Sequence, residues 1–179
     1  MLIGQSVIML LGLGLASWQE GSARWLNRPI DSLDLGFTFS FAIPLIAYAA
    51  FFSSTRAQSV AWVQKVVDSF RFGPVKGLLQ ARAFLIVLFA FVASFGEESL
   101  FREFIQMRFG LGLSALLFGA IHPVSVPFFL AMSGFGLIHG ILFNLVGHNI
   151  WPPVITHFIY NLVGLFLMKA KLLRRWSTT

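Results

Sequence analysis

A run of 60 consecutive residues, 109–168, contains no Asp, Glu, Lys or Arg, and it limits the possible folds more than any other feature. Soluble domains carry about 25% charged residues, so an uncharged stretch of this length does not suit the surface of a soluble protein. A helix that crosses a bilayer needs about 20 apolar residues. The run can form two such helices and a shorter one, which predicts an integral membrane protein embedded in a lipid bilayer.

The remaining sequence extends this prediction to an all-α, polytopic transmembrane helical bundle. Hydrophobic residues make up 57% of the 179-residue chain. The first apolar segment resembles the core of a signal peptide, but it lacks a positive leader and a clear cleavage site, so we expect a retained helix. We expect one transmembrane domain over residues 1–179, with about six hydrophobic segments at residues 2–18, 35–52, 83–107, 111–122, 126–147 and 149–168.

Basic residues gather outside these segments and predict the orientation of the chain. Residues 53–82 hold five Lys or Arg against one acidic residue, and residues 169–179 hold four against none. Six crossings put both regions on the same side, and the positive-inside rule then makes both termini cytoplasmic. Within the first region, Val60, Val63, Val67 and Phe70 share one helical face, which predicts an amphipathic helix at the membrane interface.

Composition also excludes several kinds of chemistry. The chain has no cysteine, which excludes disulfides, thiolate catalysis and cysteine-bound metals. Its net charge of +6 is explained by contact with anionic lipid. No basic patch with interleaved aromatic residues indicates a nucleic-acid partner.

The stretch FGEESLFREF, residues 95–104, places three acidic residues and one arginine directly after fourteen uncharged residues. An acid or arginine at the bilayer centre costs about 2.5–3.5 kcal/mol on insertion scales, so such groups face a bundle interior or cavity and pair. Glu98 and Arg102 are four residues apart and can form an ion pair. Glu97 lies about 100° around the helix, has no local partner and is a candidate general base. Alternatively, the helix ends here and the charges are interfacial caps.

Two further pairs with a spacing of four residues follow in the uncharged run. Phe118 and His122 lie in the fourth segment, and His157 and Asn161 lie in the sixth. Two polar side chains on one face of an apolar helix point towards the bundle interior. For His157 and Asn161, a simple helix–helix hydrogen bond is an equal alternative to a functional role.

The other two histidines have ordinary structural explanations. His139 lies between Gly136 and Gly140 in the fifth segment, and we interpret it as a packed, satisfied core residue. His148 lies in a stretch that favours a turn, and we interpret it as an interfacial residue.

The motifs E-E-x-x-x-R at residues 97–102, F-x-x-x-H at 118–122 and H-x-x-x-N at 157–161 occur in this order. Together they resemble the CPBP family of intramembrane proteases, also called the CAAX prenyl protease or Abi family, over about residues 92–167. One departure is Glu103, which stands where the family often has glycine after the motif arginine. The resemblance implies a conical helical bundle around a polar cavity, with a motif-bearing core at about residues 83–168.

The resemblance also implies roles for individual residues. Glu97 and His122 would activate a water for attack on a peptide carbonyl. His157 and Asn161 would stabilise the oxyanion or help to hold that water. The supporting residues would be Glu98, Arg102 and Phe118. The implied partner is a membrane-associated protein or peptide, either prenylated or carrying a leader.

The sequence leaves the cofactor open between none and zinc. Glu97, His122 and His157 would make a zinc set of two histidines and one glutamate with an open position. However, the chain has no H-E-x-x-H motif, and a Glu–His pair can activate water without a metal.

Other functions remain as alternatives or are disfavoured. A membrane scaffold or peptide-binding protein of the bacteriocin-immunity kind could keep a polar cavity without catalysis. A transporter is weaker because no inverted repeat is visible. A serine protease is disfavoured because G-x-S-x-G is absent, and an aspartyl protease is disfavoured because we expect all three Asp in loops.

Overall fold

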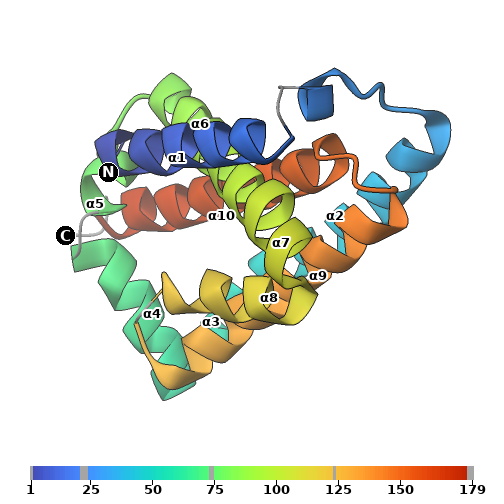
Figure 1. Cartoon of the computed structure of the whole chain (residues 1–179). Coiled ribbons are helices and arrows are strands. Elements are labelled where there is room, and N and C mark those ends of the chain that lie inside the picture. The colour runs from blue at the N-terminus through green and yellow to red at the C-terminus, as the bar shows by residue number, and fades with distance from the viewer. Residues whose placement is uncertain (1, 21–23, 73–74, 123, 177–179) are drawn as a thin grey trace.

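The computed structural model describes residues 2–20, 24–72, 75–122 and 124–176, and every regular element within these residues is helical (Figure 1). The long helices pack as a bundle, and the short ones connect them. The long helices are α1 (Leu2–Glu20), α2 (Ser32–Phe52), α6 (Ala83–Glu98), α9 (Val126–Leu145) and α10 (Trp151–Trp176). The short ones are η1 (Arg24–Asn27), α3 (Thr55–Gln58), α4 (Ala61–Phe72), α5 (Val75–Gln80), η2 (Ser99–Gln106), α7 (Met107–Phe109) and α8 (Leu111–Ala120).

Four helices among the described residues are long and apolar enough to cross a membrane, which is the pattern of a multi-pass integral membrane protein. They correspond to the second, third, fifth and sixth predicted segments: Ser32–Phe52, Ala83–Phe109, Val126–Leu145 and Trp151–Lys171. The first predicted segment forms α1. The fourth prediction is wrong as a crossing, because α8 has only 10 residues and a helix of that length covers about 15 Å.

The start of α2 lies three residues before the predicted segment because a capping box fixes it. The Asp31 carboxylate accepts a hydrogen bond from the Asp34 backbone N–H at 2.8 Å, which satisfies a free donor of the first turn. Asp34 therefore lies inside the helix and is buried, and Asp68 lies within α4. The prediction that all three aspartates lie in loops is wrong for these two.

The charged stretch lies inside a continuous helix, formed by α6, η2 and α7 over Ala83–Phe109. Its middle section, η2, is a π-helix: the Met107 N–H donates to the Arg102 carbonyl, five residues earlier. Glu97, Glu98 and Arg102 are all buried. The alternative interpretation, in which these charges are interfacial caps at a helix end, is therefore wrong.

Glycines allow the helices next to this stretch to approach closely. A Cβ on Gly12 of α1 would lie 2.8 Å from the Gly96 carbonyl oxygen, and a Cβ on Gly96 would lie 2.7 Å from the Met9 Cα. A Cβ on Gly136 of α9 would lie 2.9 Å from the Phe118 Cβ of α8. Small residues at such crossings are typical of helix packing in membranes. As a result, α1 crosses α6 in direct contact with it (Figure 1).

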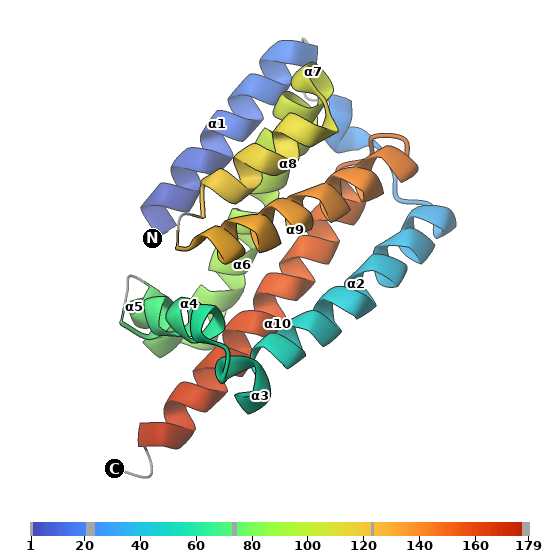
Figure 2. The same cartoon turned by 90° about the horizontal axis from the view of Figure 1, so that it is seen from below.

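The basic segment forms short helices at one end of the bundle, beside the end of α10 (Figure 2). In α4, Val63, Val66 and Val67 are buried against the protein. The predicted apolar face is therefore present, but its inclusion of Val60 is wrong, because Val60 precedes α4 and is exposed. The side chain of Phe70 lies outside the described residues.

Candidate active site

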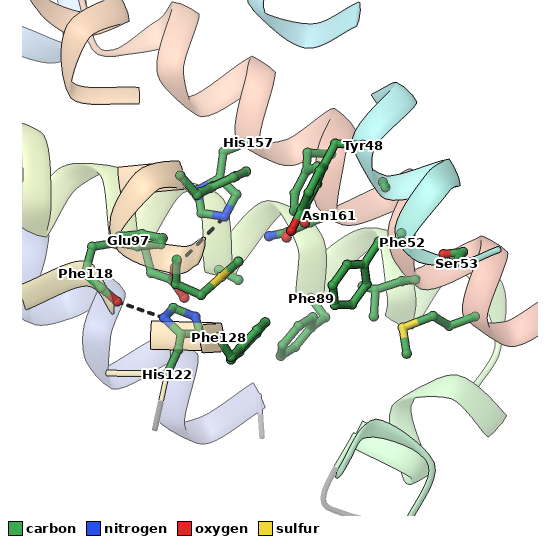
Figure 3. A pocket seen from close by; sticks show the side chains of 18 of the residues that line it. Tyr48, Phe52, Ser53, Phe89, Glu97, Phe118, His122, Phe128, His157 and Asn161 are labelled. Atoms are coloured by element: carbon green, nitrogen blue, oxygen red, sulfur yellow. Dashed lines mark hydrogen bonds and ion pairs between the residues drawn. The ribbon is translucent and has the colours of Figure 1, made fainter. Parts of the chain in front are cut away.

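A pocket of about 310 Å³ lies between α2, α6, α8, α9 and α10. All four predicted catalytic residues line it, Glu97, His122, His157 and Asn161, together with the predicted supporting residue Phe118. Figure 3 shows Glu97 and His157 pointing towards each other, with His122 close to the same end and Asn161 further along α10. Most of the other lining residues are apolar, so these polar groups face a confined and largely apolar space.

Glu97 occupies the last turn of α6 and is almost entirely buried, with 4% of its surface exposed. Its Oε2 lies 4.0 Å from Nε2 of His157. That separation is too long for a direct hydrogen bond and leaves both atoms free to contact a third group. Among the described residues, no hydrogen bond or ion pair links Glu97 to His122, although both side chains line the pocket.

His157 is held by Glu98, a pairing that the sequence did not predict. Nδ1 of His157 lies 2.7 Å from Oε1 of Glu98, and both side chains are buried. A carboxylate can only accept hydrogen bonds, so Nδ1 carries the proton and donates. In the neutral ring, Nε2 then has a free lone pair, and it is the nitrogen that faces Glu97.

The predicted ion pair between Glu98 and Arg102 is present. Nε of Arg102 donates to Oε2 of Glu98 at 2.9 Å, and both side chains have 0% exposure. A buried ion pair recovers its desolvation cost only when the remaining polar atoms find partners. Here each oxygen of Glu98 accepts one strong hydrogen bond, one from Arg102 and one from His157.

Two residues that extend this network were missed in the sequence, although the buried Nη2 of Arg102 still has no hydrogen-bond partner among the described residues. Nη1 of Arg102 donates to Oε1 of Gln106 at 2.9 Å and to Oγ of Ser114 at 3.4 Å. Ser114 in turn donates to the Phe101 carbonyl at 2.7 Å. Gln106 follows Arg102 by the same four-residue spacing that links Glu98 to Arg102, and this spacing was the available signal.

His122 lies two residues after the end of α8 and is oriented by the last turn of that helix. Its Nδ1 donates to the Phe118 carbonyl at 2.9 Å, so its Nε2 is also free to accept when the ring is neutral. The Phe118 ring is 1% exposed. Its centroid lies 5.1 Å from that of His122 and 6.0 Å from that of His157. Phe118 therefore packs against both imidazoles.

Asn161 lies one turn after His157 on α10 and is partly buried. Its Nδ2 donates to Oγ of Ser94, on α6, at 3.2 Å. This contact keeps the amide at the pocket wall, where it can supply hydrogen-bond donors. The predicted catalytic residues thus bring one carboxylate, two imidazole acceptors and one amide donor to the pocket.

The two remaining histidines lie outside the pocket lining. His139 is fully buried, as predicted, and its Nδ1 donates to the Phe135 carbonyl at 3.1 Å. It is not fully satisfied, because its buried Nε2 has no partner among the described residues. His148 is exposed in the turn before α10 with φ of 66°, which agrees with the predicted turn.

The geometry does not match the zinc set that the sequence leaves open. Within the described part of the chain, no three His, Asp or Glu side chains lie close enough together to hold a metal ion. Glu97, His122 and His157 are therefore too widely spaced for joint coordination in this conformation.

Comparison with known proteins agrees with the motif pattern. Residues 79–163, which contain all three motifs, match the family described as type II CAAX prenyl endopeptidase Rce1-like. No curated protein and no solved structure matches the chain. The resemblance drawn from the three motifs is thereby confirmed, and residues 79–163 belong to the Rce1-like family of CAAX prenyl endopeptidases.

Proposed function

We propose that this protein is an intramembrane endopeptidase that hydrolyses a peptide bond of a membrane-associated protein or peptide. The family membership of residues 79–163 supports this reaction class. The observation that carries the proposal is the meeting of Glu97 and His157 across a buried pocket, with 4.0 Å between the carboxylate and the imidazole.

In the proposed mechanism, a water in the pocket donates one hydrogen to the Glu97 carboxylate and the other to a free Nε2 atom, of His157 or of His122. Glu97 removes one proton from the water as the oxygen attacks the carbonyl carbon of the scissile peptide. The carbonyl oxygen becomes an oxyanion. When the tetrahedral intermediate collapses, the C–N bond breaks and Glu97 returns the proton to the leaving nitrogen.

Asn161 is the proposed oxyanion donor. Its Nδ2 carries two hydrogens, and the contact with Ser94 uses one of them. Pre-positioned donors stabilise an oxyanion strongly in a site from which water is largely excluded. With Nδ1 of each ring already donating, the two histidines are better suited to hold the water than to donate to the oxyanion.

The supporting roles follow from contacts of buried groups. Glu98 fixes the tautomer and orientation of His157, and Arg102 holds the Glu98 carboxylate in place. Phe118 packs against both imidazole rings. These three residues act on the position of the catalytic groups rather than on the peptide.

The apolar part of the pocket suits a substrate with an apolar group near the cleaved bond. Phe52, Phe89, Phe128, Met132 and Leu165 line the pocket beside the polar end. A prenylated C-terminus and a membrane-embedded peptide or leader both have this character, and the proposal includes both.

For the orientation, we propose that the basic segment 53–82 and the C-terminal tail face the cytoplasm. Nζ of Lys169, on α10, donates to the Ala81 carbonyl at 2.5 Å. This contact supports a common side for the two basic regions without relying on the number of crossings. The positive-inside rule then favours the cytoplasmic side.

The test compares wild-type protein with the Glu97→Gln variant in two ways. Purified protein is incubated with a farnesylated CAAX peptide and with the same peptide lacking the lipid. Membranes from cells that express each form are then compared by quantitative proteomics. We expect Glu97→Gln to abolish cleavage and to leave an uncut protein accumulating, while Asp68→Asn, on α4 outside the pocket lining, behaves as wild type.

Two results would count against the proposal. If neither assay finds a peptide that wild type cuts and Glu97→Gln leaves uncut, the chain is not an endopeptidase that uses this site. If the Glu97→Gln variant instead keeps the cellular phenotype and partner binding of wild type, the scaffold alternative is supported.

A further inference from the structure

We infer that Gln106 is a positioning residue for His157, acting through Arg102 and Glu98. The inference rests on the proposed function, in which Nε2 of His157 works at the pocket. Gln106 lies on η2, outside the three motifs, and is 6% exposed. It does not line the pocket, so any effect on the reaction has to pass through other residues.

The contacts of Gln106 fix the direction of its amide. Its Oε1 accepts from Nη1 of Arg102 at 2.9 Å. Its Nε2 donates to the Gly140 carbonyl and to Oδ1 of Asn144, both at 2.9 Å. Turning the amide over would put its NH₂ against a guanidinium and its oxygen against two acceptors, so only one orientation fits. Gln106 therefore ties Arg102 to α9.

Space for this arrangement depends on the glycine at residue 140. A Cβ there would lie 2.6 Å from Oε1 of Gln106 and 2.8 Å from Nη1 of Arg102. The amide and the guanidinium are thus packed directly against the α9 backbone. Arg102 has little freedom to move while Gln106 stays in place. Among the described residues, its other side-chain acceptors are Glu98 and the more distant Ser114.

Arg102 in turn positions His157 through Glu98. Nε of Arg102 holds one oxygen of Glu98, and the other oxygen accepts the Nδ1 proton of His157 at 2.7 Å. Because Nδ1 keeps this proton, Nε2 stays unprotonated towards Glu97 in the neutral ring. A guanidinium that lost Gln106 could turn towards the freed Gly140 carbonyl, which would weaken its hold on Glu98 and let the Nε2-protonated tautomer form.

A purely structural role for Gln106 predicts a different result. In that case the residue would only join η2 to α9, and its loss would lower stability without changing the ring of His157. The distinguishing measurement is therefore the position of the His157 ring proton. This measurement is independent of whether the protein cleaves peptides, so its failure is distinct from failure of the proposed function.

The experiment uses the full chain labelled with ¹⁵N-histidine in detergent micelles, with His157 assigned by its absence from a His157→Asn variant. In wild type we expect the neutral ring to be protonated at Nδ1 only. In Gln106→Met, which keeps the bulk but removes every hydrogen bond, we expect a second signal set from the Nε2-protonated tautomer. Asn144→Ala removes one of the two acceptors of the amide and leaves Arg102 held, so its spectrum should match wild type.

The inference is overturned if the His157 signals of Gln106→Met match those of wild type, or if Asn144→Ala shows the same change as Gln106→Met. Should Gln106→Met not give a folded protein, Gln106→Asn takes its place. Its amide is one methylene too short to reach both Arg102 and the Gly140 carbonyl, so it carries the same expectation and the same refuting result.

Discussion

Replacing Gly96 by alanine tests how closely α1 must approach the helix that carries Glu97. The new Cβ would lie 2.7 Å from the Cα of Met9 and 2.9 Å from its backbone nitrogen, whereas ordinary contacts begin at 3.4 Å. Because both are backbone atoms, no side-chain rotation relieves the overlap. The two helices have to move apart by more than half an ångström at this crossing.

The size of the effect follows from two opposing contributions. Overpacking in a tight interior costs about 1–3 kcal/mol, whereas alanine is favoured over glycine in a helix by about 1 kcal/mol. Gly14→Ala on α1 is the matched control, because a Cβ there meets nothing within 4 Å. It gains the same propensity without the overlap, so the difference between the two variants isolates the steric cost.

The assay is thermal unfolding of both variants in one detergent, followed by tryptophan fluorescence. In chains of 150–250 residues, each kcal/mol shifts the melting temperature by about 2–4 °C, so Gly96→Ala should melt roughly 2–12 °C below Gly14→Ala. Peptide cleavage should also fall, because residue 96 directly precedes Glu97. If Gly96→Ala melts at or above the temperature of Gly14→Ala, the close approach of α1 to α6 is not as described.

Three further predictions concern the charged network, the α2 contact and the orientation. Glu98→Gln leaves Arg102 buried without a charged partner and should cost about 3–5 kcal/mol in thermal unfolding, whereas Glu97→Gln should melt near wild type. Asn149→Ala removes a buried 2.7 Å hydrogen bond to Asp34 and should cost about 1–3 kcal/mol by the same measurement. Because the chain has no cysteine, Ser59→Cys should react with an impermeant maleimide in inverted vesicles and not in intact cells; labelling in intact cells would refute the orientation.

The spacing of residues along the sequence was enough to predict the long helices and one ion pair. Apolar runs bounded by charged residues located the long helices, and the four-residue spacing predicted the contact between Glu98 and Arg102. Both depend on the geometry of a single helix, which the sequence largely determines. Helix ends were less well predicted, as at α2, where the Asp31 cap adds a first turn before the apolar run.

Contacts between helices could not be predicted in the same way. Glu97 and Glu98 differ only by rotation about α6, and the sequence does not show which of them forms the direct hydrogen bond to His157, 59 residues from Glu98. The contact between Asn149 and Asp34, 115 residues apart, could not be predicted from the sequence for the same reason. The sequence located the residues that gather at the pocket, but their pairing depends on how the helices rotate and cross.

The π-helical section makes the site sensitive to chain length. A π-helix contains more residues in each turn than an α-helix, so removing one residue between Ser99 and Gln106 could let that section become an ordinary α-helix. A shift of one residue rotates the following side chains by about 100°. Arg102 or Gln106 would then no longer lie on the helix face that carries Glu98, although the segment would remain equally apolar. The spacing of this motif is therefore as strict a requirement as the identity of its residues.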